Sequence, residues 1–389
     1  MYKIRTYNAI SSKGLERFPA DSYQVSSDCA DPVGVLLRSQ KLHNEVMPES
    51  VVAVARAGAG TNNIPTADYT DQGIVVFNTP GANANAVKEL IVASLLMGSR
   101  DIYGGMNYVQ GLTEITDSAE MGQLLEKEKK RFAGGEVQGK TLGVIGLGAI
   151  GSMIANLALE LGMDVVGYDP AISVEAAWQL SSNVERMDSI EALLARSDFI
   201  TLHVPAIPAT KHLINSKTLS IMKSTAKILN FAREEIVSSA DVVEALDNGV
   251  ISGYITDFPA PELLGRKDVL LMPHIGASTA EAEENCAVMA ANQLMDFLEN
   301  GNILNSVNYP QIKMARNGGT RITFTNKNVP KVLGNVLSIL ADSNLNVVDM
   351  VNKSRDEIAY NIIDIEGDFD DSLQANIAAV EGVVHVRII

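Results

Sequence analysis

The chain has 389 residues, 46% of them hydrophobic and 20% charged, the balance of an ordinary globular protein large enough for two or three domains. The formal net charge of −16 leaves no basic face for the phosphates of a nucleic acid, so nucleic-acid binding is excluded as an expected function. No apolar run reaches the length of a membrane span, the N-terminus is unlike a secretory signal, and the 2 cysteines have no metal-ligand spacing, so we expect a cytoplasmic protein without membrane contact or bound metal.

The first hundred residues alternate short apolar runs with helical segments, which is the pattern of a parallel α/β domain. The strand-like runs are Val33–Leu37, Val51–Ala55 and Ile74–Phe77. A second block of the same kind follows beyond residue 100. We therefore predict two Rossmann-like α/β domains with doubly wound parallel sheets, facing one another across a ligand cleft at the carboxyl ends of their strands.

The stretch from Lys140 to Asp169 carries the strongest functional signal in the sequence. An apolar run meets the pattern Gly146-x-Gly148-x-x-Gly151, a helical pattern follows, and a second apolar run ends in Asp169. This order of strand, glycine turn, helix, strand and acid is typical of a dinucleotide site.

Each part of this turn has a physical role. Gly146 permits the tight turn, Gly148 lets the backbone approach a pyrophosphate, and Gly151 lets helix and strand pack closely. The helix N-terminus offers free N–H groups to the phosphates, and Asp169, 18 residues after Gly151, can accept hydrogen bonds from a ribose. An ordinary βαβ turn would not explain three glycines and the acid together, so we predict that a dinucleotide binds here.

Further strand patterns continue this second sheet, and a helix follows them. The expected strands are Phe199–His203, Lys227–Asn230, Ile251–Thr256 and Val269–Leu271. The helical pattern of Ala280–Asn300 ends at Asn300-Gly301, which is a helix-stop signal.

A nicotinamide-dependent enzyme also needs a group that exchanges a proton with its substrate. Among the 5 histidines, His203 and His274 each follow a predicted strand at its carboxyl end. His274 begins a loop that leads into a helix and can project into a cleft, whereas His203 could equally line the cofactor. The pattern favours His274 and leaves His203 as the alternative.

Two more side chains are candidates for the same site. Arg233 follows a predicted strand, where its guanidinium could hold a carboxylate and an adjacent carbonyl oxygen; alternatively, it is a surface arginine paired with Glu234 or Glu235. Glu262 lies in a Pro-rich loop 12 residues before His274, and a carboxylate beside an imidazole favours the protonated ring and fixes its tautomer.

Beyond the flexible break Asn317-Gly318-Gly319-Thr320, a separate module of about 70 residues is expected. Its patterns read βαββαβ, the order of a small ferredoxin-like fold. The expected elements are Arg321–Thr325, Val329–Ser343, Val347–Met350, Ala359–Ile365, Ser372–Val380 and Val383–Ile389. The module is too small to share a catalytic core, so we predict a regulatory role, with plain oligomerisation as the alternative.

These residues resemble the D-isomer-specific 2-hydroxyacid dehydrogenase family, in order, over essentially the first 315 residues. The matching segments are Arg56-Ala-Gly-Ala-Gly60, Val76-Phe-Asn-Thr-Pro80, Val87-Lys-Glu-Leu90, Gly143–Gly151, His203-Val-Pro205, Asn230-Phe-Ala-Arg233, Asp257 and Pro273-His-Ile-Gly276. The resemblance implies a catalytic set of Arg233, Glu262 and His274, and so it selects His274 over His203.

The resemblance further implies NAD-dependent oxidation of 3-phospho-D-glycerate to 3-phosphohydroxypyruvate, the first step toward L-serine. Asp169, with no arginine close after it, favours NAD over NADP. The turn and the resemblance together give an NAD site made of Gly146, Gly148, Ala149, Ile150, Gly151, Asp169, His203, Val204, Pro205, Ala232, Asp257 and Gly276. The alternatives are a related dehydrogenase for glyoxylate, hydroxypyruvate or lactate, and a binding protein without turnover.

The substrate phosphate needs positive charge in the first domain, for which we select Arg38 and Arg56, with backbone N–H groups at Ala57 and Gly58 near the substrate carboxylate. Lys88 stands where the family has a small residue. Related enzymes exchange the segment around residues 100–140 between subunits, so we expect a homodimer or homotetramer.

The tail resembles an ACT domain, an amino-acid-sensing module. The positions that match the residues of serine-sensing versions are Asn326, Asn328 and Asn346. Because Asn326 replaces a histidine and Lys331 a glycine of that pattern, inhibition by serine is left open. The predicted division is a substrate domain of residues 1–98 and 287–315, an NAD domain of residues 99–286 and an ACT-like domain of residues 320–389.

Overall fold

The computed structural model describes residues 1–389, apart from the side chain of Glu175, and the chain divides into two compact units. One unit comprises Met1–Asn83 with Thr279–Ile389, and the other is Ala84–Ser278. The boundary precedes α3 (Ala84–Ser99) because this helix packs with the elements of the second unit. The predicted domain limits, which begin the NAD domain at residue 99, remain a prediction.

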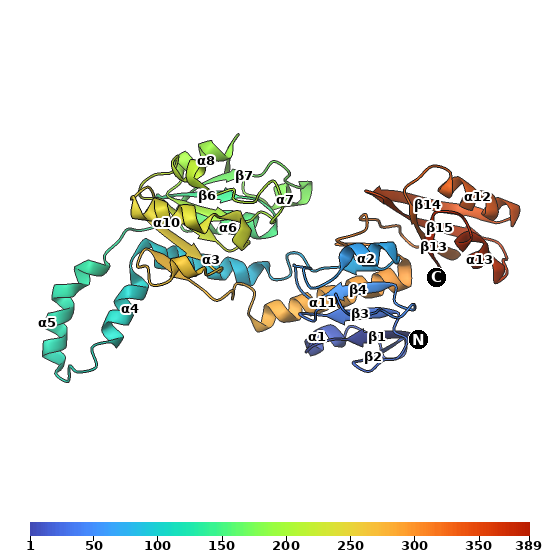
Figure 1. Ribbon diagram of the computed structural model, residues 1–389, viewed down its shortest axis with the longest axis horizontal. Helices are drawn as coiled ribbons and strands as arrows, with labels where there is room; N and C mark the ends of the chain where they lie inside the picture. Colours follow the sequence, from blue (N-terminus) through green and yellow to red (C-terminus); the bar gives the residue numbers. More distant parts are fainter. The chain divides into compact units, whose positions relative to one another are not determined.

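The first unit contains a parallel sheet of strand order β2-β1-β3-β4-β5. These strands are β1 (Tyr2–Thr6), β2 (Tyr23–Ser26), β3 (Gly34–Leu37), β4 (Ala53–Arg56) and β5 (Val75–Phe77). The long helix α11 (Ala280–Asn300) packs on this sheet, and its buried side chains join those of the strands in one apolar core. Shorter helices α1 (Ser12–Leu15) and α2 (Thr66–Asp71) complete this part (Figure 1).

The second unit is built on a parallel sheet of order β12-β11-β10-β9-β6-β7-β8, which is a doubly wound topology. Its strands are β6 (Thr141–Ile145), β7 (Asp164–Tyr168), β8 (Glu185–Arg186), β9 (Phe199–Leu202), β10 (Lys227–Asn230), β11 (Gly253–Thr256) and β12 (Val269–Leu271). Around them lie α6 (Ala149–Glu160), α7 (Val174–Gln179), α8 (Ile190–Arg196), α9 (Ser216–Leu219), α10 (Ser239–Asp247), η2 (Glu234–Ile236) and η3 (Pro261–Leu263).

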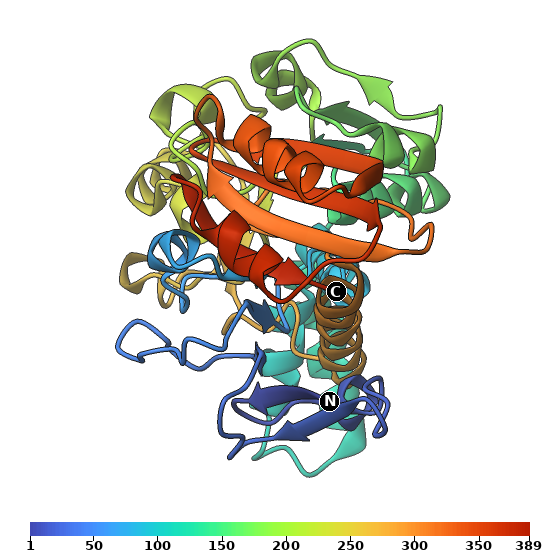
Figure 2. The same cartoon turned by 90° about the vertical axis from the view of Figure 1, so that its right-hand side faces the viewer.

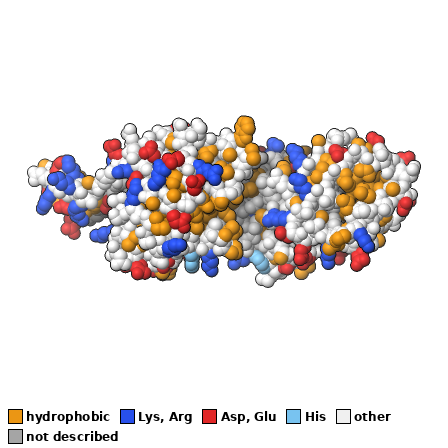
Figure 3. All heavy atoms as spheres, turned by 90° about the horizontal axis from the view of Figure 1, so that it is seen from above, with side chains coloured by type: hydrophobic (Ala, Val, Ile, Leu, Met, Phe, Trp, Pro, Cys, Tyr) orange, Lys and Arg blue, Asp and Glu red, His pale blue; other side chains and the backbone are white. Residues whose placement is uncertain are grey.

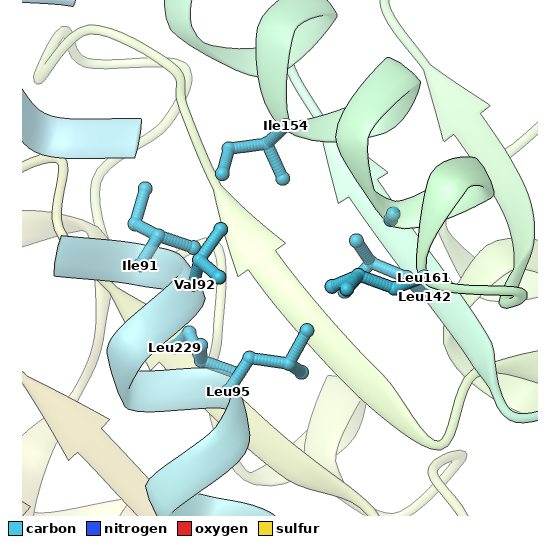
Figure 4. A pocket seen from close by; sticks show the side chains of 8 residues that line it. Ile91, Val92, Leu95, Leu142, Ile154, Leu161 and Leu229 are labelled. Carbon is cyan, nitrogen blue, oxygen red and sulfur yellow. The ribbon is translucent and has the colours of Figure 1, made fainter. Parts of the chain in front are cut away.

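A small apolar gap beneath α3 shows how tightly the helices pack on this sheet. Side chains from α3, α6 and the strands line it, as Figure 4 shows for Ile91, Leu95, Ile154 and Leu229. Its volume of about 10 Å³ is at the lower limit for one water molecule, and its walls are apolar. The gap is therefore a packing defect of the core and offers no room for a ligand.

Between α3 and the second sheet the chain forms an arm of two helices, α4 (Ile102–Gln110) and α5 (Ser118–Glu128), followed by η1 (Lys129–Phe132) (Figure 1). Both helices are capped by aspartates, since Asp101 accepts from Gly104 N and Asp117 from Glu120 N. Arg131 lies over the rings of Tyr108 and Phe132, at 5.3 and 5.5 Å. Figure 3 shows both basic and acidic side chains on this arm, at left.

The tail module has the predicted βαββαβ order, with an antiparallel sheet of order β14-β15-β13-β16. Its elements are β13 (Thr320–Lys327), α12 (Val332–Asp342), β14 (Asn346–Arg355), β15 (Ile358–Glu366), α13 (Ser372–Ala378) and β16 (Val383–Ile388). Both helices cover one face of the sheet, as Figure 2 shows, and bury a core of their own against it. The ferredoxin-like expectation is confirmed.

The other face of the tail sheet packs on the first sheet's core, which the sequence does not predict. Ile358, Tyr360 and Ile362 of β15 belong to the same apolar cluster as residues of β1, β5 and α11. Polar groups join there as well: the Tyr360 hydroxyl donates to the carbonyl of Gly301 (3.0 Å), and Arg387 donates to that of Leu298 (2.6 Å). The tail thus supplies partners for carbonyls at the C-terminal end of α11, which the helix itself leaves open.

A buried ion pair anchors this contact. Arg321 of β13 is fully buried and makes a bidentate pair with Asp364 of β15, at 2.6 and 2.7 Å. Its remaining N–H groups donate to the carbonyls of Asn300, Met314 and Ala315 at 2.9–3.0 Å. Because every contact is made inside the protein, the pair links the tail firmly to the end of α11.

The predicted strands and helices of the second sheet and the tail are confirmed, with ends that differ by a few residues. The strands β1 and β2 and the arm helices were not predicted. Among the described helices, none is long and apolar enough to cross a membrane.

Candidate active site

The glycine turn after β6 has the geometry that its sequence predicts. Gly146 has φ +90°, and a Cβ there would lie 2.6 Å from the carbonyl oxygen of His203. A Cβ on Gly151 would lie 2.0 Å from the carbonyl oxygen of Gly146, so only glycine allows α6 to start against the strand. At Gly148 a Cβ would meet no atom within 4 Å, which leaves the backbone open to an approaching ligand.

The start of α6 presents open N–H groups, and the carboxylate of Asp169 lies beside the glycine turn. Gly148 is the N-cap of α6 and provides no side-chain partner, so the first N–H groups of the helix, at Ala149 and Ile150, are available to phosphate oxygens. Asp169 follows β7, and its carboxylate accepts from Leu147 N (2.8 Å) and from Ala171 N (2.9 Å). These two bonds fix the carboxylate beside the turn and leave each oxygen a second lone pair for ribose hydroxyls.

His203 lies at the end of β9, where Val204 and Pro205 follow it. Burial lowers the pKa of its imidazole to about 3, and its Nε2 lies 2.9 Å from the hydroxyl of Thr201. A ring with so low a pKa is neutral at physiological pH and cannot hold a substrate proton there. This environment suits His203 to line the cofactor site, and it favours His274 as the group that exchanges the proton.

Arg233 follows β10 at the carboxyl edge of the sheet. Its side chain is exposed, and Nη1 donates to the carbonyl of Ala232 at 2.6 Å. The fully buried Asn230 braces this turn, because its amide donates to the Arg233 carbonyl (2.9 Å) and accepts from Ala232 N (3.2 Å). Among the described side chains Arg233 forms no ion pair with Glu234 or Glu235, so the surface-pair alternative receives no support.

His274 lies in the loop after β12, held in position by Asp257. This buried carboxylate follows β11 and accepts from the N–H groups of Ile275 (2.8 Å) and Gly276 (2.7 Å). His274 itself has φ +57°, which is rare for a residue with a side chain, and its ring packs on Phe258 at 4.9 Å. The exposed imidazole is thus presented from a fixed loop.

Glu262 lies in η3, directly downstream of β11, and its side chain is exposed. In the described structure it shares no hydrogen bond with His274. Arg233, Glu262 and His274 nevertheless follow β10, β11 and β12, which are neighbours in the parallel sheet. The fold therefore brings the three predicted catalytic residues to the same edge as the glycine turn.

The predicted phosphate ligands lie in the first unit, at the ends of two neighbouring strands. Arg38 follows β3, Arg56 ends β4, and Arg56 Nε donates to the carbonyl of Arg38 at 3.0 Å. Ala57 and Gly58 follow, and a Cβ on Gly58 would lie 2.7 Å from Arg56 Nη1. Glycine thus allows the guanidinium to fold close over the backbone. Lys88, in α3, donates to the side chain of Asn85 at 2.5 Å.

The predicted effector residues divide between the two ends of the tail sheet. Asn326 is buried, and its side-chain oxygen accepts a hydrogen bond from the amide of Asn361. The side chain of Asn328 donates to the carbonyl of Asp356 (3.2 Å). Asn346 pairs with Glu366, and Asn326 pairs with Ala359 at the other end of β15. Within one chain, Asn346 is therefore distant from the other two.

Sequence patterns miss several supporting residues. Asn230 gives a recognisable signal, an amide at the end of an apolar strand, whereas the carboxylate that holds Arg38 comes from Glu283, far along the chain. Among the described residues, no group of three His, Cys, Asp or Glu side chains could hold a metal ion.

Known proteins have sequences related to that of this chain. The family model "D-isomer specific 2-hydroxyacid dehydrogenase, NAD binding domain" matches residues 105–276. D-3-phosphoglycerate dehydrogenase of Escherichia coli K12 is 32% identical over 386 residues, which cover 95% of this chain and 90% of that protein. The enzyme of the same name from Methanocaldococcus jannaschii is 36% identical over 309 residues, but this chain spans only 56% of its length.

Solved structures agree with the fold. The NAD⁺-bound 3-phosphoglycerate dehydrogenase of Entamoeba histolytica aligns with a TM-score of 0.60 at 25% identity, covering 80% of this chain and 99% of that one. A glyoxylate/hydroxypyruvate reductase of Sinorhizobium meliloti has a TM-score of 0.66 at 21% identity, covering 79% and 98%, and supports the fold alone.

Proposed function

This chain belongs to the D-isomer-specific 2-hydroxyacid dehydrogenase family, and we propose that it oxidises 3-phospho-D-glycerate to 3-phosphohydroxypyruvate, the first step toward L-serine. One observation carries the chemistry: Arg233, Glu262 and His274 follow three neighbouring strands of the sheet that carries the glycine turn and Asp169. The whole-length similarity to the E. coli enzyme supports the choice of substrate.

NAD fits the residues present and, when bound, accepts the hydride from C2 of the substrate. Ala149 and Ile150 would bind the pyrophosphate through their N–H groups, and Asp169 the adenosine ribose. Val204, Pro205, Ala232 and Gly276, with His203, would line the nicotinamide end. A carboxylate at position 169 repels a 2′-phosphate, which favours NAD over NADP.

His274 is the group that takes the C2 hydroxyl proton. Imidazole exchanges protons near neutral pH, and this one is exposed on a loop that Asp257 fixes through two backbone N–H groups. Glu262 would stabilise the imidazolium when its carboxylate reaches the ring. Arg233 would hold the substrate carboxylate and C2 oxygen through its paired N–H groups.

Arg38 and Arg56 would bind the substrate phosphate, and the N–H groups at Ala57 and Gly58 would contact the carboxylate. Two guanidinium groups on adjacent strand ends suit a dianion, because each can donate two N–H groups to its oxygens. This pair would bind a phosphorylated substrate more tightly than hydroxypyruvate or glyoxylate, which lack the phosphate.

We expect a homodimer or homotetramer in the cytoplasm. The arm leaves Tyr103, Met106 and Val109 exposed, at 57%, 63% and 43%, as expected of a surface that a second subunit covers. If L-serine binds the tail through Asn326, Asn328 and Asn346, the pocket needs two chains, since one chain separates these residues.

The reaction can be tested by following NADH consumption with 3-phosphohydroxypyruvate, hydroxypyruvate and glyoxylate in parallel, each with and without L-serine. We expect the phosphorylated substrate to be used best. Equal or better use of hydroxypyruvate would identify a different member of the family, and NADH binding without turnover of any 2-oxo acid would identify a binding protein.

A further inference from the structure

Arg38 is held by a carboxylate from a distant part of the chain. Its Nη2 lies 2.6 Å from Oε1 of Glu283, and both side chains are 43% exposed. Glu283 lies near the start of α11, where Thr279 caps the helix by accepting from Ala282 N (3.1 Å). The helix therefore presents Glu283 from a fixed position to a solvated arginine.

A second cation lies beside this ion pair. Arg56 is the register partner of Leu37, the residue before Arg38, and its Nε donates to the carbonyl of Arg38. Cys286, on the next turn of α11, lies close enough to both arginines and to Glu283 for all three charges to act on its thiol. The cluster thus holds two positive charges and one negative charge at one place in the first unit.

We propose that Glu283 sets the affinity of the phosphate site: its carboxylate competes for Arg38 and occupies it until a dianionic phosphate group takes its place. This inference rests on the proposed function, in which Arg38 and Arg56 bind the substrate phosphate. A solvated ion pair is weak, so a ligand with two negative charges can replace the carboxylate at little cost. A ligand with a hydroxyl group or a single negative charge at this position gains much less electrostatic energy when it replaces the carboxylate.

The opposite role would be a purely structural one, in which Glu283 holds Arg38 in the orientation that binds phosphate. The two roles predict opposite signs. If Glu283 competes with phosphate, its neutralisation strengthens phosphate binding. If it only orients Arg38, the same change weakens binding.

The test is Glu283→Gln, with Glu281→Gln as the matched control. Glu281 lies in the same first turn of α11, is exposed, and forms no ion pair or hydrogen bond with Arg38 among the described side chains. We expect E283Q to lower KM for 3-phosphohydroxypyruvate about threefold to tenfold, with kcat and the KM for hydroxypyruvate within about twofold of the unmodified protein. E281Q should leave all of these values unchanged.

A binding measurement on the full chain gives a readout that does not depend on turnover. Inorganic phosphate should raise the melting temperature of E283Q at lower concentrations than it does for the unmodified protein or E281Q. An unchanged or weaker response to phosphate in E283Q would overturn the inference.

A double-mutant cycle with Arg38→Gln separates the two proposals. We expect R38Q to raise KM for the phosphorylated substrate and to abolish the effect of E283Q. If R38Q raises that KM while E283Q leaves it unchanged or raises it, the proposed function stands and the role of Glu283 is wrong. If R38Q leaves the KM unchanged, Arg38 does not bind the phosphate and both assignments fail.

Discussion

At the scale of single residues, His203 and His274 show how environment divides two chemically identical rings. Each follows a strand at its carboxyl end, so their sequence positions are equivalent. His203 is half-buried beside Thr201 and kept neutral by desolvation, whereas His274 is exposed on a loop held by Asp257. The structure thus supplies a physical reason for the choice that the sequence pattern leaves open.

Replacing His274 by Asn should lower kcat by roughly 10²-fold or more, because the hydroxyl proton then has no acceptor of suitable basicity. NADH binding should be retained, since none of the phosphate-binding or ribose-binding groups changes. Steady-state rates together with an NADH titration measure both. Near-full activity in H274N would show that another group takes the proton.

The desolvated, neutral ring of His203 predicts a pH dependence of stability. Its pKa is about 3 in the folded chain and near the ordinary 6.5 when unfolded, so between these values the unfolded chain binds more protons. The contribution of His203 to stability is therefore complete above pH about 6.5 and is lost as the pH falls toward about 3.

Thermal unfolding between pH about 7 and 4 should consequently be less pH-dependent in His203→Gln than in the unmodified protein. His43→Gln serves as control, because His43 is an exposed histidine in the loop between β3 and β4. Parallel curves for H203Q and the unmodified protein would mean that the pKa of the ring does not differ between the folded and unfolded chain.

At the scale of elements, we expect two glycines of the same turn to serve different purposes: Gly151 is needed for folding and Gly148 for ligand binding. Gly151→Ala places a Cβ 2.0 Å from a backbone carbonyl oxygen, so the start of α6 must shift and stability must fall. Gly148→Ala meets no protein atom, so the fold should be unchanged while NADH affinity falls at least about tenfold.

Melting temperatures and NADH titrations of the two variants, beside Gly122→Ala in the arm, measure this difference. Gly122 has no atom near its missing Cβ and lies in a helix, so alanine there should be neutral or slightly stabilising. Unchanged NADH binding by G148A would place the pyrophosphate elsewhere.

The sequence predicts those elements whose burial pattern is regular. The strands β6, β9 and β10 are almost wholly buried and give continuous apolar runs. By contrast, β1 is only half-buried along most of its length and buries fully only Ile4, so its pattern, YKIRT, lacks the continuous apolar run of a buried strand. The catalytic set follows from resemblance, whereas the ion pair of Glu283 with Arg38 joins distant parts of the chain and is encoded by no local pattern.

At the scale of the whole molecule, the polar face of the tail sheet is the least predictable feature. Arg321, Thr323 and Thr325 alternate with apolar residues in β13, which is typical of a strand with one face in water. All three are nevertheless buried, because that face covers the end of α11 and its open carbonyls. The sequence predicts the module but not its docking.

Asp364→Ala should lower the free energy of unfolding by about 3–5 kcal/mol, because Arg321 would remain buried without its carboxylate. Asp368→Ala, an exposed change in the same module, should have little effect. Urea unfolding of the full chain measures both. A loss of less than about 1 kcal/mol in D364A would show that the tail is not held by this pair.

The proposed function makes this chain a dehydrogenase selective for a phosphorylated 2-hydroxy acid. The most direct measurement is the ratio of kcat/KM for 3-phosphohydroxypyruvate to that for hydroxypyruvate, with NADH as the reductant. We predict a ratio of about 100 or more, because two arginine contacts to a dianion are lost with the phosphate. A ratio near or below about 1 would contradict the account and leave Arg38 and Arg56 without the role assigned to them.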